Sequence, residues 1–407
     1  MQPTRLFFVL SALLLAGCAN TTTQCSPVNC GGCCDADGQC RDGNTNDACG
    51  AAALNCNVCV GGQTCTDKRC VMQVVDSGVQ IPDDAGTPIL APVETWTWAD
   101  FPNTACGNGA PTGVGINVST RSRDVFIFLM GGGACWDSLT CAFAASNLST
   151  GYGSQQFAQE QVLGLAPFDR AQPANPLKDM SFVFVPYCTG DVHAGDSVMN
   201  YPAVGTQIPA RTVHHKGRTN LEAFLVRLHD TFPDAARVFL SGSSAGAFGA
   251  QLNYARVAAT WPNAEVHMLA DCAQLVNPSG TLLSQWKTAW NLEVPAACVG
   301  CETDLSLFPK FLHDSAPNRR FGLLAYTQDG TLRQFAGYDA ATYEQRTLAL
   351  SASAYDTTTN GKYFIVAGSS HVMLDQMLQL QGPGGVSLLS WIQAFVSGNS
   401  SWQSVKP

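Results

Sequence analysis

A serine stands at the centre of a short glycine-rich motif near the middle of the chain. Residues 242–246 read GSSAG and fit the pattern G-x-S-x-G, with Ser244 in the third position. An apolar run, residues 237–240, precedes the motif, and an alanine-rich stretch suited to a helix follows it. A strand, a tight turn and a helix in this order expose a serine hydroxyl above a sheet. An ordinary turn serine is the alternative, but this context favours a nucleophile at Ser244.

A serine nucleophile needs a general base, and the base needs a group that orients it. After a serine of this kind, the acid and then the histidine follow along the chain. His371 is the only histidine after Asp329, and it lies just beyond the late apolar run YFIVAG. Asp271 and Asp329 each end an earlier apolar run. The later position of Asp329 favours it as the partner of His371, with Asp271 as the alternative.

A developing oxyanion must also be stabilised. The three glycines at residues 131–133 directly follow the apolar run DVFIFLM. Backbone N–H groups that no side chain shields can point at an oxyanion there, together with the N–H of Ala245, the residue after the serine. We therefore expect an oxyanion hole between this loop and Ala245.

The elements that must position these residues are visible as a repeated pattern. From about Glu94 onward, runs that are apolar on both faces alternate with helical stretches, which predicts a doubly wound, mostly parallel α/β sheet. A capping box at residues 219–222 predicts a helix that starts there and ends before Pro233. The expected strands are GVGINV, DVFIFLM, SFVFVPY, RVFLSG, EVHMLAD, FGLLAYTQD and KYFIVAG.

Several longer motifs resemble a known family. The segments MGGGACWDSLTC, PYCTGDVHAGD and GSSAGAFGA, with HHKGRTNL and TQDG, are similar to the pectin acetylesterase and Notum family of α/β-hydrolase carboxylesterases. The similarity covers most of residues 94–400. It implies an α/β-hydrolase fold. It also implies a triad and an oxyanion hole, formed by Ser244, Asp329 and His371 and by the backbone of Gly132, Gly133 and Ala245.

The chain departs from this family beside the oxyanion hole. The family often has L-E-G-G-G-W-C, whereas here Met130 and Ala134 replace the acid and the tryptophan, and Trp136 is the nearest substitute. This changes the wall of the pocket and therefore bears on the acyl group that is accepted. The resemblance further implies two disulfides, Cys135–Cys141 and Cys106–Cys188.

The N-terminal residues have the layout of an export signal. Arg5 precedes an apolar stretch, residues 6–16, which is too short to span a bilayer. The following LAGC resembles the lipobox of bacterial lipoproteins, so we expect a signal peptide over residues 1–18 and lipid attachment to Cys18. An ordinary signal peptide is the alternative. The protein is expected to be exported, and either lipid-anchored to the bacterial envelope, at the outer membrane or cell surface, or secreted.

Cysteine usage agrees with export, because the chain has 18 cysteines. Ten of them crowd into residues 25–70, a segment too small to bury a core without staples. We expect a disulfide-rich module over residues 19–70, although its pairing cannot be read. Zinc bound by the Cys-x2-Cys pairs is a weaker alternative, because the module has no histidine. Residues 71–93 have the composition of a linker, which leaves residues 94–407 as the catalytic domain.

Composition excludes several classes of function. The net charge of −9 argues against nucleic-acid binding. Asp191, His193 and Asp196 have a spacing that could suggest a metal, but the triad needs none, so we expect neither metal nor cofactor. The basic run at residues 211–218 is either a solvated loop or a surface for an anionic substrate.

These observations predict a serine carboxylesterase that removes acyl groups, with acetyl favoured, from a polysaccharide such as pectin. The expected partners are this acylated polysaccharide and a membrane, reached through the lipid on Cys18. One alternative is a lipase-like or polyester-cleaving hydrolase of longer acyl esters. The other is a catalytically inactive lipoprotein that binds a surface through its cysteine-rich module.

Overall fold

The computed structural model describes most of the 407 residues and divides the chain into two compact units, residues 1–71 and 72–407. The predicted signal peptide and Cys18 lie outside the described residues. The described residues are 25–26, 29–51, 53–59, 63–66, 68–72 and 87–407.

The first unit is held together by disulfides. All ten cysteines of residues 25–70 are paired, which leaves none of these thiols to bind zinc. The pairs are Cys25–Cys34, Cys30–Cys40, Cys33–Cys56, Cys49–Cys65 and Cys59–Cys70. They connect short strands: β1 (Cys33–Cys34), β2 (Cys40–Arg41), β3 (Asn44–Thr45), β4 (Ala48–Cys49), β5 (Gln63–Thr66) and β6 (Arg69–Met72).

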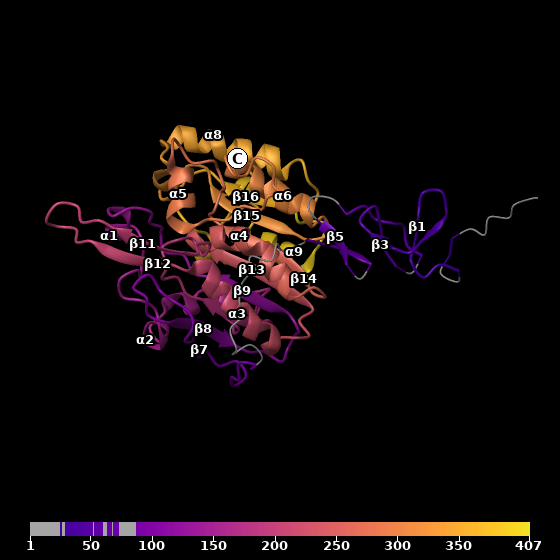
Figure 1. Ribbon diagram of the computed structural model, residues 1–407, viewed down its shortest axis with the longest axis horizontal. Coiled ribbons are helices and arrows are strands. Elements are labelled where there is room, and N and C mark those ends of the chain that lie inside the picture. Colours follow the sequence, from indigo (N-terminus) through magenta and orange to yellow (C-terminus); the bar gives the residue numbers. More distant parts are fainter. Residues whose placement is uncertain (1–24, 27–28, 52, 60–62, 67, 73–86) are drawn as a thin grey trace, which may run out of the picture. The chain divides into compact units, whose positions relative to one another are not determined.

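The second unit is built around an eight-stranded sheet in the order β16-β15-β14-β13-β9-β10-β8-β7 (Figure 1). Six of these strands are parallel, and β7 and β8 extend the sheet in the antiparallel sense. The expected doubly wound α/β architecture is therefore confirmed. The strands are β7 (Thr97–Phe101), β8 (Thr112–Asn117), β9 (Val125–Leu129), β10 (Ser181–Val185), β13 (Arg237–Ser243), β14 (Glu265–Asp271), β15 (Phe321–Tyr326) and β16 (Gly361–Val366).

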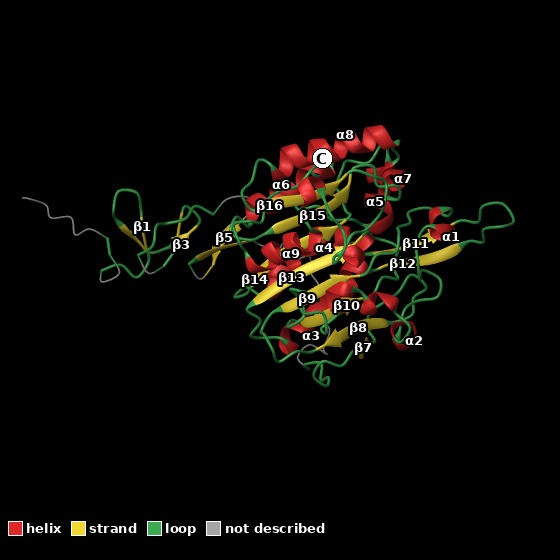
Figure 2. Cartoon of the chain, turned by 180° about the vertical axis from the view of Figure 1, so that it is seen from behind, coloured by secondary structure: helices red, strands yellow, loops and turns green. Residues whose placement is uncertain are grey.

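Helices cover both faces of this sheet. The helices α3 (Gly217–Thr231) and α4 (Ala245–Thr260) lie on the face turned to the viewer in Figure 1, and α9 (Leu388–Ser397) lies on the face shown in Figure 2. On the α9 side, Phe239 packs edge-on against Phe395. The other α-helices are α1 (Thr140–Phe143), α2 (Ser154–Phe157), α5 (Leu282–Trp290), α6 (Phe308–Ser315), α7 (Leu332–Ala336) and α8 (Ala340–Leu350).

None of the helices in the described part of the chain has the length and apolar character that a membrane span requires.

The predicted start of α3 is wrong by three residues, because the N-cap is Lys216 and not Thr219. The helix begins at Gly217, after Lys216, and not at the predicted capping box. The side chains of that box are engaged elsewhere, because Thr219 bonds Asp196 and Asn220 bonds the backbone of Ala105. Tertiary hydrogen bonds thus replaced the local cap. The helix ends at Thr231, before Pro233, as predicted.

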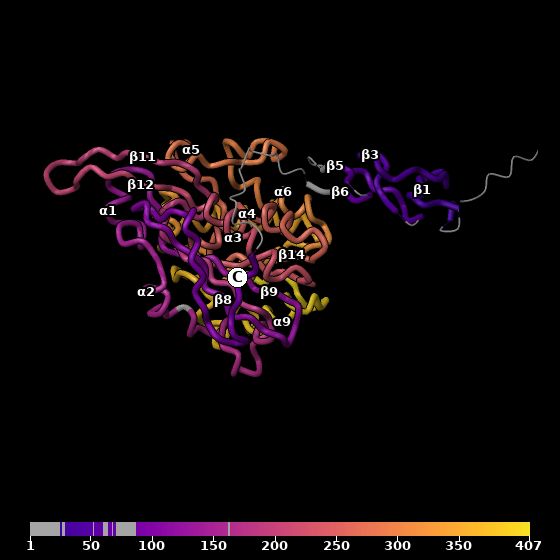
Figure 3. Tube along the Cα trace, turned by 60° about the horizontal axis from the view of Figure 1, so that its bottom comes forward, coloured from indigo at the N-terminus to yellow at the C-terminus, as the bar shows by residue number. Residues whose placement is uncertain are grey.

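A hairpin formed by β11 (Ser197–Tyr201) and β12 (Arg211–His215) stands apart from the large sheet. It extends outward from the second unit in each of the views, most clearly in Figure 3. The sequence pattern did not reveal it, because its strands mix polar and apolar residues and the buried positions include His215 as well as Tyr201 and Val213.

Residues 87–93, which the sequence assigned to the linker, contact the second unit. Ile89 is buried in its core, and its N–H donates to the Thr231 hydroxyl at 2.8 Å. The guanidinium of Arg227 donates to the carbonyl of Thr87. Packing against α3 therefore begins at residue 87.

Two buried histidines should make the fold sensitive to acid. His267 and His313 are almost fully inaccessible to solvent. Burial, reinforced by Arg320, lowers the pKa of His267 to about 3. Burial alone is the main cause that lowers the pKa of His313 to about 4. A histidine whose folded-state pKa is depressed stabilises the fold fully above the unfolded pKa, and that stability is lost as the pH falls below it.

We therefore expect these two histidines to lower the free energy of unfolding by about 3 kcal/mol between pH 6.5 and pH 5, about 1.5 kcal/mol each, while the raised pKa of the buried Asp271 offsets about 1 kcal/mol of this fall. The pKa values of His193 and His215 are also lowered by burial, which acts in the same direction. Urea unfolding at a series of pH values measures this effect. His313→Gln should flatten the pH dependence, whereas His229→Gln at an exposed site should not. A free energy of unfolding that is constant from pH 7 to pH 5 would contradict the prediction.

Candidate active site

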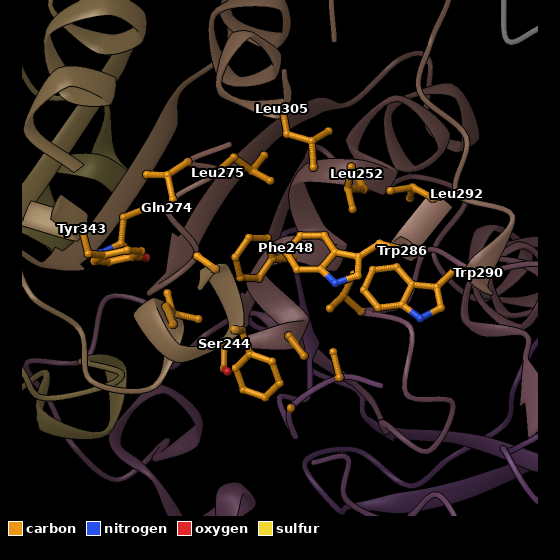
Figure 4. Close-up of a pocket in the computed structure, with 18 residues that line it drawn as sticks. Ser244, Phe248, Leu252, Gln274, Leu275, Trp286, Trp290, Leu292, Leu305 and Tyr343 are labelled. Carbon is orange, nitrogen blue, oxygen red and sulfur yellow. The ribbon is translucent and has the colours of Figure 1, made fainter. Parts of the chain in front are cut away.

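Ser244 occupies a strained turn between β13 and α4. Its backbone has φ 55° and ψ −124°, in the left-handed half of conformational space that side chains rarely adopt. Gly246 crosses so close to β9 that a Cβ there would overlap the carbonyl oxygen of Leu129. Glycine at this position therefore allows the turn to be tight. The turn presents Ser244 at one end of a pocket (Figure 4).

The glycine loop after β9 lies beside this serine. A Cβ on Gly131 would lie 3.1 Å from the Cβ of Ser244. Gly133 has φ 76°, and no backbone carbonyl in the described chain accepts from the N–H of Gly132 or Gly133. Ala245 is the first residue of α4, where an N–H has no partner within the helix. The N–H groups expected to form an oxyanion hole are thus available beside Ser244.

A buried histidine supports the glycine loop from behind. His193 Nε2 donates to the carbonyl oxygen of Met130 at 2.8 Å, and the ring lies close to Tyr187. His193 has φ 58°, and burial lowers its pKa, so it is held neutral. Its role here is to fix the backbone that leads into Gly131.

The structure brings His371 and Asp329 together. His371 Nδ1 lies 2.8 Å from Asp329 Oδ2. The other carboxylate oxygen of Asp329 accepts from the N–H groups of Thr331 and Leu332 at 3.0 and 2.9 Å. Asp329 is fully buried, whereas the His371 side chain is 22% exposed. The carboxylate is thus fixed in place and leaves the histidine's other nitrogen available to act as a base.

Asp271, the alternative acid, has other partners. Its carboxylate accepts from the Ser243 hydroxyl at 2.6 Å and from the N–H of Met373 at 2.8 Å. Burial raises its pKa to about 6. Asp271 therefore lies behind the site, and Asp329 is the carboxylate bonded to His371.

An apolar pocket opens next to Ser244. Figure 4 shows the indoles of Trp286 and Trp290 on one side and Gln274 with Tyr343 on the other. The two indoles stack with ring centroids 5.6 Å apart. The remaining lining is largely aliphatic or aromatic and includes Ala134, Val192, Phe248, Leu252, Leu275, Leu292, Leu305, Leu332 and Phe335.

Most of these pocket residues were not found from the sequence. Trp286 and Trp290 are four residues apart on α5, so they share one helical face, which is a signal that the sequence does contain. Ala134 lines the pocket where the family often has tryptophan, and Trp136 instead packs against Trp286 and Phe335. Trp290 Nε1 donates to the carbonyl of Cys135 and so ties α5 to the loop that carries Ala134.

A free thiol lies under the histidine. Cys272 is fully buried, and its sulfur lies within 4.8 Å of ligand atoms of both Asp329 and His371. Burial and the charges of Asp271 and Asp329 raise the pKa of this thiol well above its ordinary value. It is the cysteine that remains once Cys298 pairs with Cys301. From the sequence alone, one of Cys272, Cys298 and Cys301 is expected to stay unpaired, but the sequence does not identify which one.

The other disulfides of the second unit are Cys106–Cys188 and Cys135–Cys141. These are the two pairs that the family resemblance implied. They brace the loops on either side of the glycine loop, because Cys135 N bonds the carbonyl of Gly190 and the N–H of Gly107 bonds the carbonyl of Cys188.

The basic run at residues 211–218 is committed to internal contacts. Arg211 donates to the carbonyl of Cys141. Lys216 and Arg218 both pair with Asp196, at 2.6 and 3.2 Å, and His215 is buried. These cations hold the hairpin and α3 in place, so the run gives little support to an anionic substrate.

The trio that suggested a metal is likewise part of the scaffold. Asp191 accepts from the Thr189 hydroxyl and from the N–H of Gly217, and His193 bonds Met130. Asp196 belongs to the ion pairs described above.

A mostly parallel sheet, a serine at a strained strand–helix turn and a histidine–aspartate pair beyond later strands define the α/β-hydrolase class of fold. A family model described as "Pectinacetylesterase" matches residues 95–291. The match covers just under half of the chain, and it supports the similarity to the pectinacetylesterase family that the motifs indicated. The matched range includes the glycine loop and Ser244, and it ends before Asp329 and His371.

Curated relatives agree with this assignment. The chain is 29% identical over 176 residues to the palmitoleoyl-protein carboxylesterase NOTUM of Mus musculus, covering 41% of this chain and 33% of that protein. It is 28% identical over 158 residues to the palmitoleoyl-protein carboxylesterase notum2 of Xenopus laevis, covering 38% of this chain and 30% of that protein. The similarity therefore spans about a third of the length of these relatives.

Proposed function

We propose that this protein is a serine carboxylesterase with Ser244 as its nucleophile. One observation carries the proposal: a strained serine lies between free N–H groups and an apolar pocket, in a fold whose late loops hold a bonded His371–Asp329 pair. Similarity to the family supports the same class of reaction. The strained serine turn and the bonded His371–Asp329 pair make an inactive binding protein the weaker alternative.

The proposed reaction has two halves. His371 takes the proton of the Ser244 hydroxyl as the oxygen attacks the ester carbonyl, and Asp329 stabilises the imidazolium that forms. The N–H groups of Gly132, Gly133 and Ala245 receive the negative charge that develops on the carbonyl oxygen. The alcohol leaves with the proton from His371. Water then attacks the acyl-enzyme with the same assistance, and the acid is released with Ser244 restored.

The pocket supports an apolar acyl group longer than acetyl. Its lining contains few polar side chains besides Ser244, Gln274 and Tyr343, and it extends from Ser244 toward Leu305 on the opposite side (Figure 4). An acetyl group would leave most of this apolar surface uncovered. The replacement of the family's tryptophan by Ala134 leaves more room beside the oxyanion hole. We therefore place medium-chain or longer acyl esters first.

Removal of acetyl groups from a polysaccharide such as pectin is the second candidate. The description of the family model favours it. The internal pairing of the basic run removes the separate argument for a uronate polymer. The two candidates share the same mechanism and differ in the acyl group.

The proposed location is outside the cytoplasm. Eight disulfides in the described residues fit an oxidising compartment. Attachment to a membrane through a lipid on Cys18 is the corresponding proposal for the N-terminus, and mass spectrometry of the mature protein tests it.

A chain-length profile distinguishes the two candidates. Each methylene that fits an apolar pocket adds up to about 1–3 kcal/mol of discrimination. We therefore expect kcat/KM on nitrophenyl esters to rise by about tenfold or more from acetyl to octanoyl. Ala134→Trp should lower kcat/KM for octanoyl more than for acetyl, because the indole would fill space beside the oxyanion hole. A profile that is highest at acetyl and declines steadily in both proteins would favour the deacetylase.

A further inference from the structure

Asp271 connects the two parts of the site that must meet for catalysis. It ends β14, and its carboxylate accepts from the Ser243 hydroxyl, next to Ser244. The same carboxylate accepts from the N–H of Met373 at 2.8 Å and of Leu374 at 3.2 Å. Its backbone carbonyl accepts from the N–H of Ser244 at 2.9 Å. A single buried residue thus bonds both the nucleophile turn and the loop that carries His371.

The histidine loop needs such a support. Val372, directly after His371, has φ 59°, which is unfavourable for a β-branched residue. A strained conformation of this kind persists only when the surrounding structure determines it. The two N–H groups bonded by Asp271 are those of Met373 and Leu374, the next two residues.

We infer that Asp271 is a positioning residue, which holds His371 in register with Ser244 by bonding both of their loops through one carboxylate. The inference rests on the proposed function. It gives a role to the carboxylate that the mechanism does not use. Asp271 does not touch the reacting atoms, so its loss should act through the placement of His371.

The carboxylate does this best when it is ionised. It accepts from one O–H and two N–H groups, and each of these hydrogen bonds is stronger to a carboxylate than to a neutral carboxyl. Burial raises the pKa of Asp271 to about 6, against the opposing effect of its hydrogen bonds and of His371. Tyr326 and Cys272 are the other titratable groups around it. Positioning should therefore weaken as the pH falls below about 6.

Asp271→Asn is the test in the full-length protein. Asparagine has nearly the same volume as aspartate, but its NH2 group would face a group that now donates to the carboxylate. The loop that carries His371 should therefore shift. We expect kcat to fall by about 10- to 100-fold with little change in KM, since a small misplacement of a catalytic group costs on this order. The matched comparison is Ser243→Ala, which removes the side-chain bond to the nucleophile turn but keeps the backbone bond from the N–H of Ser244 and both bonds to the histidine loop, so it should lower kcat less than Asp271→Asn does.

The pH profile provides a readout that a merely structural role would not change. In the wild type, protonation of Asp271 should add its own 10- to 100-fold loss to that of the catalytic base, so the acid limb of log(kcat/KM) should steepen to a slope of about 2 over part of the range below pH 6. In Asp271→Asn the slope should be about 1. If thermal unfolding shows that the variant does not fold, the slope of the wild-type acid limb alone tests the inference.

A wild-type acid limb with a slope of one overturns the inference, as does an Asp271→Asn protein that keeps the wild-type kcat. The proposed function fails separately. It falls if Ser244→Ala keeps its activity, whatever Asp271→Asn does. If Ser244→Ala is inactive and Asp271→Asn is fully active, only the positioning role is lost.

Discussion

Ser244→Ala should abolish ester hydrolysis, with a loss of roughly 10⁶ in turnover. Alanine removes the hydroxyl oxygen that we propose forms the acyl-enzyme. Residue 244 is small and lies at the end of a strand, so folding should be preserved, as thermal unfolding can show. Turnover of a nitrophenyl ester measures the loss.

The neighbouring serine provides the control for this prediction. Ser243 bonds Asp271 and points away from the pocket lining, so Ser243→Ala should keep most of the activity. A fluorophosphonate should label Ser244 covalently in the wild type. Mass spectrometry that places the label on Ser243, or on no serine, would overturn the assignment of the nucleophile.

Asp329→Asn has the second largest expected effect, roughly 10⁴ in turnover. The carboxylate oxygen at 2.8 Å from His371 Nδ1 fixes the tautomer that leaves Nε2 free to accept a proton. An amide can donate to that nitrogen and so select the wrong tautomer. It also no longer stabilises the imidazolium. Steady-state kinetics of the purified variant measure the loss.

The comparison with Asp271→Asn makes this prediction specific. Both residues are buried aspartates beyond the nucleophile, and only Asp329 bonds the histidine. The loss for Asp329→Asn should exceed the loss for Asp271→Asn by at least about 100-fold, from the magnitudes given above. The reverse order would make Asp271 the acid.

Local sequence patterns were sufficient for the strands of the parallel sheet and for the nucleophile turn. A strand buried on both faces is apolar along most of its length, so runs such as VFIFL in β9 indicate it without reference to any neighbour. A turn as tight as that at Ser244 needs glycine at fixed positions, and Gly246 lies against Leu129 for that reason. Asp329 and His371 followed from their order along the chain, because parallel strands bring their carboxyl ends to one edge.

Only the tertiary structure decided how polar groups were paired. The basic run looked like a free surface, but Asp196, fifteen or more residues away, pairs with Lys216 and Arg218. The observed start of α3 differs from the predicted one because the side chains of Thr219 and Asn220 form hydrogen bonds with distant residues. Asp271 was only the alternative acid in the sequence, yet it joins two loops 130 residues apart, at Ser243 and Met373. Burial and hydrogen bonds between distant segments determine how these polar side chains are paired, and no local sequence pattern predicts them. The alternation or run of apolar side chains along a strand, by contrast, depends on the geometry of that strand alone.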